Sequence, residues 1–145
     1  MLSIPEPGLM IRYSYLWRDE YVLGREEGIK DRPCAIIAAI RKSEDDKWRV
    51  LVLPVTHTAP NNTELAVEIP SNIKRNLGLD GEKSWIVISE SNEFCWPGPD
   101  LRRTGSSDNS TIGYGFLPPR FFDTVRKRFI ALEEQKRTNR VLRTE

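Results

Sequence analysis

The sequence predicts a mostly β fold: a small antiparallel β-barrel or strongly bent sheet with one short helix and one C-terminal helix. Two patterns support this class. Short apolar or alternating stretches, bounded by turn-forming residues, recur over the first two thirds of the chain and are typical of strands. Apolar residues three and four positions apart then recur near the C-terminus, which is typical of an amphipathic helix.

A run of alternating residues opens the predicted sheet. Its apolar members share one face of a strand and are Leu9, Ile11, Tyr13, Tyr15 and Trp17. Residues 33–41 and 48–55 are compact apolar runs joined by a charged connection, so they predict a hairpin of two buried strands. Residues 65–69 alternate and predict a half-exposed strand. Residues 84–89 predict a fifth strand, and residues 94–96 predict a short sixth one that ends at a Pro-Gly-Pro turn.

Two helices are predicted among and after these strands. Ser71 is a good N-cap for a short helix over residues 72–77, and Gly78 suits its C-cap. A longer helix is predicted over 119–137, opened by a Pro-Pro pair. Its apolar face consists of Phe122, Val125, Phe129 and Leu132.

The 145 residues are long enough for one domain, since domains usually hold about 100–200 residues. We predict a single domain over residues 1–145, with a barrel over about 8–117 and a basic tail over 138–145 after the long helix. Residues 104–115 are rich in Gly, Ser, Thr, Asn and Asp, so they predict a loop; they contain no phosphate-binding fingerprint.

Composition and charge exclude several functions. The 22 basic and 21 acidic side chains nearly cancel, which argues against uniform attraction to nucleic acid but leaves a local basic patch open. One histidine and two distant cysteines argue against a structural zinc site; no metal or cofactor is predicted, and Cys34 is predicted to be a buried free thiol. The sequence lacks a signal-peptide pattern and any apolar run of roughly 20 residues. We therefore expect a cytoplasmic protein with no membrane association.

The first candidate functional cluster is the charged loop that ends at Arg32. Pro33 biases Arg32 toward extended backbone and so places it at the root of a buried strand. The fork of donors of a guanidinium fixed there suits a phosphate oxygen or a carboxylate. The alternative is an ion pair between Arg32 and a loop acid such as Glu26 or Asp31.

The second cluster is Thr56, His57 and Thr58, where two hydroxyls and the single imidazole follow the third strand. Histidine is the side chain whose ordinary pKa suits proton transfer near neutral pH, so His57 and its neighbour Thr58 are candidates for acid-base work or substrate binding. The alternative is turn chemistry, because threonine side chains commonly accept hydrogen bonds from nearby backbone at strand ends.

The third cluster follows the predicted fifth strand. Glu90 and Glu93 are further candidates for acid-base work or substrate binding, although a spacing of three places them on opposite sides of a regular strand. Trp96 is either a core aromatic residue or a platform on which a nucleic-acid base stacks.

Taken in order, these stretches resemble the MazF/PemK family of toxin–antitoxin toxins. The resemblance covers about residues 8–96 and depends on the order and spacing of its parts. The matching stretches are 8–11 (GLMI), 32–37 (RPCAII), 52–56 (VLPVT), 65–79 and 85–88. Residues 96–101 (WPGPDL) are similar to a divergent branch of PemK-like growth inhibitors.

The resemblance implies an SH3-like barrel of the MazF, PemK and CcdB type that forms a homodimer. It also implies a sequence-specific endoribonuclease that cleaves single-stranded RNA without metal, by attack of a ribose 2′-hydroxyl on the adjacent phosphate. By position, Arg32 matches the family's catalytic arginine and Thr56 its catalytic threonine. The implied protein partner is a cognate antitoxin. Candidate residues for binding RNA or the antitoxin are Trp17, Arg25, Lys30 and Trp96.

A second function stays open at this point. Many relatives carry an Arg-Thr-Ile-Asp-like stretch after the fifth strand, whereas residues 93–96 (EFCW) keep neither charge in kind. The acidic loop over 19–31 is also a poor surface for RNA. Both observations favour a non-catalytic protein of the same fold that binds another protein or regulates its operon with an antitoxin. Poisoning of a topoisomerase, known for a related barrel toxin, has no support in the basic stretch over 137–143.

Overall fold

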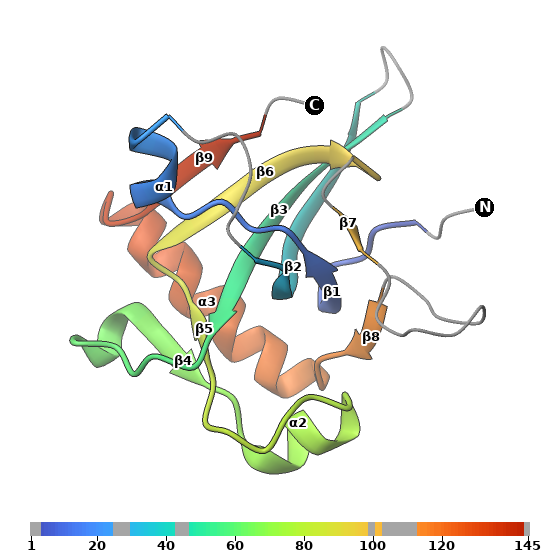
Figure 1. Ribbon diagram of the computed structural model, residues 1–145, viewed down its shortest axis with the longest axis vertical. Helices are drawn as coiled ribbons and strands as arrows, with labels where there is room; N and C mark the ends of the chain where they lie inside the picture. The colour runs from blue at the N-terminus through green and yellow to red at the C-terminus, as the bar shows by residue number, and fades with distance from the viewer. Residues whose placement is uncertain (1–3, 25–29, 43–46, 99–100, 103–112, 144–145) are drawn as a thin grey trace.

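The computed structural model describes residues 4–24, 30–42, 47–98, 101–102 and 113–143. Over these residues a curved sheet of nine strands is flanked by helices (Figure 1). The strands are β1 (Leu9–Tyr13), β2 (Arg32–Lys42), β3 (Lys47–Thr56), β4 (Ala66–Glu68), β5 (Trp85–Val87), β6 (Glu90–Trp96), β7 (Leu101–Arg102), β8 (Gly113–Phe116) and β9 (Asn139–Leu142). The helices are α1 (Arg18–Val22), α2 (Ser71–Asn76) and α3 (Pro119–Glu134), and a 3-10 turn, η1, spans Thr63–Leu65. The predicted class, mostly β and barrel-like with a C-terminal helix, is confirmed.

Strand β3 organises the sheet. It pairs antiparallel with β2, with Cys34 opposite Pro54, and a bulge between Ile36 and Ala38 interrupts the register. On its other side β3 pairs with β6 along its first half and with β5 at its end. A bulge bends its strand and increases the local twist. The bend helps the long β2–β3 pair to form hydrogen bonds with neighbouring strands that run in different directions.

The central strands are buried on both faces. Adjacent residues of a strand point to opposite sides, so Leu53 joins a core cluster that includes residues of α2 and α3, whereas Val52 joins a second cluster on the other face. The second cluster contains a stack of Tyr13 on Phe94, whose ring centroids are 4.6 Å apart. Burial on both faces explains why β2 and β3 are continuous apolar runs and not alternating ones.

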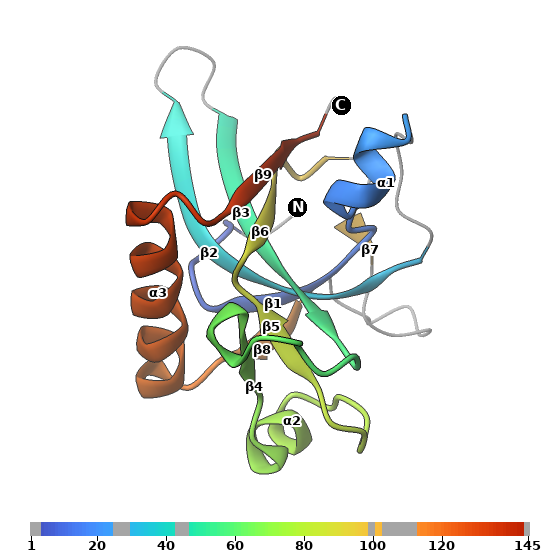
Figure 2. The same ribbon diagram turned by 90° about the vertical axis from the view of Figure 1, so that its left-hand side faces the viewer.

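Helix α3 lies along the outside of the sheet and covers the first core cluster (Figure 2). Its buried residues are Val125, Phe129 and Leu132, with Phe122 partly buried, which is the apolar face that the sequence predicts. The chain then turns back and adds β9 parallel to β6. The pairing brings the C-terminal part of the chain beside α1, where Arg18 donates a hydrogen bond to Asn139.

A buried amide joins three distant parts of the chain. Asn92 of β6 accepts a hydrogen bond from the backbone N–H of Leu16 at 2.9 Å and donates one to the Leu16 carbonyl at 2.8 Å. The guanidinium of Arg143 donates to the same Asn92 oxygen, to the Ser14 carbonyl and to the Tyr13 hydroxyl. Asn92 and Arg143 are both buried, so each depends on the other for hydrogen bonds that water cannot supply.

Three parts of the chain differ from the prediction. The alternation over 9–17 does not continue as a strand: β1 ends at Tyr13 and α1 begins at Arg18. The short predicted strand over 94–96 is the end of β6, which already begins at Glu90. Part of the expected basic tail forms β9, and α3 ends at Glu134 and not near residue 137.

Smaller differences occur at helix and loop ends. Pro70 and not Ser71 occupies the N-cap of α2, with Ser71 as the first helical residue. Strand β8 takes the end of the predicted 104–115 loop, whose residues 104–112 lie outside the described part.

Cys34 is a free, buried thiol, as the sequence predicts. Burial raises the pKa of this thiol well above its ordinary value, since a thiolate would lose its hydration there; the nearby Arg32 and Arg143 lower it only in part. Among the described residues no helix combines the length and apolar character needed to cross a membrane.

Replacing Asn92 by alanine should destabilise the protein strongly. The change leaves the Leu16 N–H and carbonyl and one Arg143 hydrogen bond without their partner, and each buried unpaired group costs about 1–3 kcal/mol. We expect a loss of about 3 kcal/mol or more in the free energy of unfolding, measured by urea denaturation. The exposed Asn76→Ala should stay within about 0.5 kcal/mol of the original protein. A loss below about 1 kcal/mol for Asn92→Ala would contradict this account.

Candidate functional site

A cavity of about 520 Å³ opens where β2 begins and β3 ends. Arg32 enters it from the start of β2, and Thr56, His57 and Thr58 enter it from the end of β3. In an antiparallel pair the start of one strand lies beside the end of the other, so these two groups meet despite their distance in the sequence. The opposite wall includes Lys74 of α2 and residues of the 79–84 loop.

Arg32 is fixed by its neighbours on two sides. Its Nη1 donates to the Val55 carbonyl at 3.1 Å, and the guanidinium carbon lies 4.8 Å from the ring centroid of Trp17. The expected ion pair with Asp31 is not made, because that carboxylate pairs with Arg12 and Arg102; Glu26 lies outside the described residues. Among the described residues, the buried Nε of Arg32 has no hydrogen-bond partner. Buried donors rarely lack a partner, so this Nε–H is a donor that the fold itself does not use within the described residues.

Thr56 and Thr58 form the side-chain-to-backbone turn contact that the sequence allows as the alternative to a functional role. The side-chain oxygen of Thr56 accepts the backbone N–H of Thr58 at 3.1 Å. This contact uses the oxygen as an acceptor only, so the Thr56 hydroxyl hydrogen is still available to donate. Turn formation and a role toward a ligand in the cavity are therefore compatible at Thr56.

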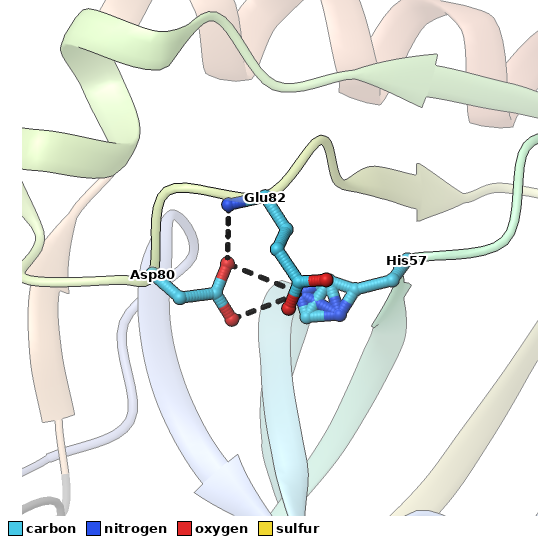
Figure 3. A group of neighbouring side chains, drawn as sticks. All are labelled: His57, Asp80 and Glu82. Atoms are coloured by element: carbon cyan, nitrogen blue, oxygen red, sulfur yellow. Dashed lines mark hydrogen bonds and ion pairs between the residues drawn. The ribbon is translucent and has the colours of Figure 1, made fainter.

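His57 faces a pair of carboxylates across the cavity edge (Figure 3). Its Nε2 lies 2.9 Å from Asp80 Oδ2 and 3.1 Å from Oδ1. The nearest oxygen of Glu82 is 4.0 Å from the same nitrogen, and the Glu82 side chain is 77% exposed. Asp80 is therefore the partner of His57, and Glu82 is a looser neighbour.

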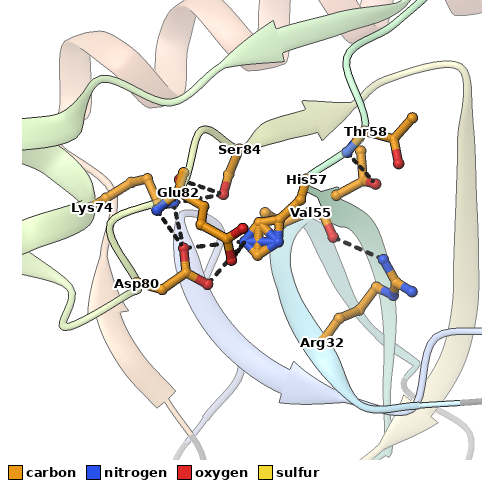
Figure 4. Close-up of polar contacts among 9 residues, drawn as sticks. Arg32, Val55, His57, Thr58, Lys74, Asp80, Glu82 and Ser84 are labelled. Carbon is orange, nitrogen blue, oxygen red and sulfur yellow. Dashed lines mark hydrogen bonds and ion pairs between the residues drawn. The ribbon is translucent and has the colours of Figure 1, made fainter.

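A buried lysine anchors this group from behind (Figure 4). The ammonium of Lys74 donates to Asp80 Oδ1 at 2.9 Å, to Ser84 Oγ at 2.6 Å and to the Glu82 carbonyl. Partial burial raises the pKa of Asp80, but the hydrogen bonds from Lys74 and from the Glu82 backbone N–H more than offset it. The pKa of Asp80 therefore lies below its ordinary value.

His57, Asp80 and Glu82 are also the one group within the described residues whose donor atoms are close enough together for a metal ion. One imidazole and two carboxylates can hold a divalent cation. However, the Lys74 ammonium already occupies Asp80 Oδ1 and adds a positive charge next to the position that an ion would take. The arrangement therefore suits a hydrogen-bonded chain of side chains better than a metal site.

Trp17 connects the cavity to two neighbouring hollows. One of them is bordered by Tyr15, Asp19 and Lys30, and the other by the segment that follows Thr58. Both hollows include the Trp17 side chain, and Lys30 also borders the main cavity. The indole thus forms a shared wall between three adjoining concave surfaces, with the Arg32 guanidinium against it.

Three candidates from the sequence lie away from this cavity. Glu90 accepts hydrogen bonds from the Tyr15 hydroxyl and the Arg18 backbone N–H. Glu93 pairs with Arg49 and Arg140. Trp96 is buried in the second core cluster beside Phe94, which is the core alternative and not an exposed stacking platform. All three act in holding the fold together. The candidate Arg25 lies outside the described residues.

No pattern in the sequence singles out Lys74 or Asp80. Lysine is a residue type that is usually exposed on a helix. Lys74 is buried because the 79–84 loop folds over it. Asp80 shares no motif with His57, and the two meet only because the 79–84 loop and the residues after β3 line the same cavity. A useful signal would have been the turn-forming run after Leu77, which marks a loop able to present a carboxylate.

Comparisons with models of protein families, with curated proteins and with solved structures find no match to this chain. Its function must therefore be argued from the cavity and from the sequence.

Glu90, which lies away from the cavity, allows a test of the electrostatics of a partly buried carboxyl. Burial raises the pKa of its carboxyl, although the hydrogen bonds from Arg18 and Tyr15 lower it in part. A raised folded pKa contributes stability that is full below the unfolded pKa and is lost as pH rises through the folded pKa. Glu90→Gln removes this dependence, so the variant should gain stability relative to the original protein between about pH 4 and about pH 8.

Urea unfolding at the two pH values measures this difference. The exposed Glu68→Gln serves as the control and should show a smaller change with pH. A relative stability of Glu90→Gln that falls as pH rises would contradict the prediction.

Proposed function

We propose that this protein is a metal-independent endoribonuclease that cleaves single-stranded RNA by attack of a ribose 2′-hydroxyl on the adjacent phosphate. The observation that carries the proposal is the convergence of Arg32 and Thr56 on one cavity, with His57 next to them. The resemblance to MazF/PemK toxins selects the same arginine and threonine from sequence order alone. The two arguments are independent, since sequence order does not require the side chains to face one cavity.

The reaction needs three things from a protein: positive charge near the phosphate, a group that takes the 2′-hydroxyl proton and a proton for the departing 5′-oxygen. Arg32 supplies a guanidinium whose position is already fixed by Val55 and Trp17, so little reorganisation is needed when charge develops on the phosphate. Thr56 can donate its hydroxyl hydrogen to a phosphate oxygen. His57 is the candidate for proton transfer.

The surroundings of the cavity fit a single strand of RNA. Aromatic rings stack on unpaired bases, and Trp17 is shared by the cavity and the two hollows beside it. Lys30 adds a second positive charge at the cavity edge. A chain of nucleotides that passes Trp17 would place a phosphate near Arg32 and the adjoining bases in the neighbouring hollows.

The biological role that follows from this proposal is that of a toxin in a type II toxin–antitoxin system, active as a homodimer and silenced by a cognate antitoxin. An antitoxin with an acidic segment would compete with RNA for Arg32 and Lys30, because carboxylates and phosphates bind the same donors.

A second candidate function is non-catalytic protein binding. Helix α1 and the residue after it expose three consecutive apolar side chains, Tyr21, Val22 and Leu23, the last of them 80% exposed. Contiguous exposed apolar residues are typical of protein contact surfaces. The same surface also fits the antitoxin or homodimer contact of the main proposal, so only a test of RNA cleavage separates the two functions.

The decisive experiment incubates the purified protein with a long unstructured RNA in excess chelator. We expect discrete fragments that end in 2′,3′-cyclic phosphate and begin with a 5′-hydroxyl. Arg32→Ala should lower the cleavage rate about 100- to 1,000-fold, since it removes a fixed donor that stabilises transition-state charge. An all-deoxy strand of the same sequence should not be cleaved, because it lacks the attacking hydroxyl.

The matched control is Arg41→Ala. Arg41 lies on the same strand as Arg32, is exposed, and contacts Trp48 away from the cavity. It should keep most of the activity while removing the same charge. If the original protein is folded and free of bound antitoxin and still cleaves no RNA, the result favours protein binding as its function. If Arg32→Ala and Arg41→Ala are equally active, Arg32 has no role in the cleavage.

A further inference from the structure

The contacts around His57 form a continuous chain of four side chains. Ser84 and the Glu82 carbonyl accept hydrogen bonds from the Lys74 ammonium, Lys74 donates to Asp80, and Asp80 contacts the His57 ring (Figure 4). No motif in the sequence links these residues. The chain begins in a buried part of the protein and ends at the edge of the cavity that holds Arg32 and Thr56.

We infer that Asp80 is a positioning residue that holds the His57 ring for proton transfer, and that Lys74 fixes Asp80 for this purpose. The inference rests on the proposed ribonuclease function and adds two residues to its site. Both carboxylate contacts of His57 use Nε2, which leaves Nδ1 as the ring nitrogen that this inference assigns to the substrate. A carboxylate that accepts from one imidazole nitrogen fixes both the ring orientation and the tautomer.

The step this arrangement supports is the first proton transfer of the cleavage. The neutral ring, with its hydrogen on Nε2 toward Asp80, takes the proton of the ribose 2′-hydroxyl on Nδ1. The 2′-oxygen then forms its bond to phosphorus, and the bond from phosphorus to the 5′-oxygen breaks. The departing 5′-oxygen takes up a proton from water, and the imidazolium later returns its proton to solvent. The products are a 2′,3′-cyclic phosphate and a 5′-hydroxyl.

The buried ammonium of Lys74 donates to three acceptors, one of which is Asp80. Placing an ammonium out of water is costly, and an ion pair with a partner as exposed as Asp80, at 51%, recovers only part of that cost. The ammonium nevertheless holds one oxygen of Asp80, which also accepts the Glu82 backbone N–H at 3.1 Å. Asp80 is thus oriented from two sides, although its side chain is half exposed.

Other charged groups also face this part of the cavity. Glu82 is the second carboxylate near Nε2, and Lys30, Asp31 and Arg32 border the cavity on the side of β2. Only Asp80 is within hydrogen-bond distance of the His57 ring among the described residues. The comparison of Asp80 with Glu82 therefore separates an oriented contact from a general effect of negative charge.

The test compares Asp80→Asn with Glu82→Gln, two substitutions that each remove one negative charge beside His57. Asp80→Asn should lower kcat for RNA cleavage roughly 10- to 100-fold and change KM little, since misplacing a catalytic group by about 1 Å has effects of this size. Glu82→Gln should keep its kcat within about twofold, as its oxygen is beyond hydrogen-bond distance. Asp80→Glu should recover part of the lost kcat. Equal kcat for Asp80→Asn and the original protein would overturn the inference.

A second measurement does not require activity. The chain contains one histidine, so the ring signals of His57 in an NMR spectrum are unambiguous. Carbon relaxation of the ring should give an order parameter of about 0.8 in the original protein and in Glu82→Gln. In Asp80→Asn it should fall toward about 0.6, the range of flexible groups. An order parameter that is unchanged in Asp80→Asn would overturn the positioning role.

The two measurements distinguish the failure of each proposal. If the original protein cleaves no RNA, the proposed function fails, while the order parameters still decide whether Asp80 holds the ring. If the protein cleaves RNA and Arg32→Ala does not, but Asp80→Asn keeps full kcat, the ribonuclease function stands and the role of Asp80 is rejected.

Discussion

The hydrogen bonds between Asn92 and the backbone of Leu16 are the contact on which the rest of this structure depends. They fix the position of the chain directly before Trp17, after the chain has left the sheet at the end of β1. Trp17 in turn lies against the guanidinium of Arg32. One buried amide in β6 therefore sets the position of an aromatic wall that belongs to the N-terminal part of the chain. A polar group in a core can specify a unique arrangement, because every alternative leaves it without partners.

The parts of the fold that could be predicted are those whose sequence carries a local pattern. The runs that form β2 and β3 and the apolar face of α3 are visible because burial there repeats along the element. Helix α1 has no such signal, since its five residues are too few for an isolated helix. It is held by the local cap between Glu20 and the Trp17 backbone and by tertiary contacts such as that of the Arg18 backbone with Glu90. Strand β9 is four residues long and two of its side chains are polar, so it carries no strand pattern in the sequence and its pairing with β6 makes it a strand.

The same distinction applies to the site. Arg32, Thr56 and His57 could be selected because each stands at the end of a strand, where side chains leave the sheet together. Lys74 and Asp80 could not, because their importance comes from a loop that folds over the end of α2 and from nothing in their neighbours along the chain. Glu90, Glu93 and Trp96 are of residue types typical of sites, but in the structure their side chains take part in the hydrogen bonds, ion pairs and packing of β6.

The parallel pairing of β9 with β6 has a consequence for the synthesis of this protein. Until β9 and Arg143 have been translated, β6 has an unpaired edge, and Asn92 and Tyr13 lack one of their buried partners. An open strand edge is a template for pairing with other chains. The nascent polypeptide is thus open to aggregation through this edge from the synthesis of β6 until β9 is complete.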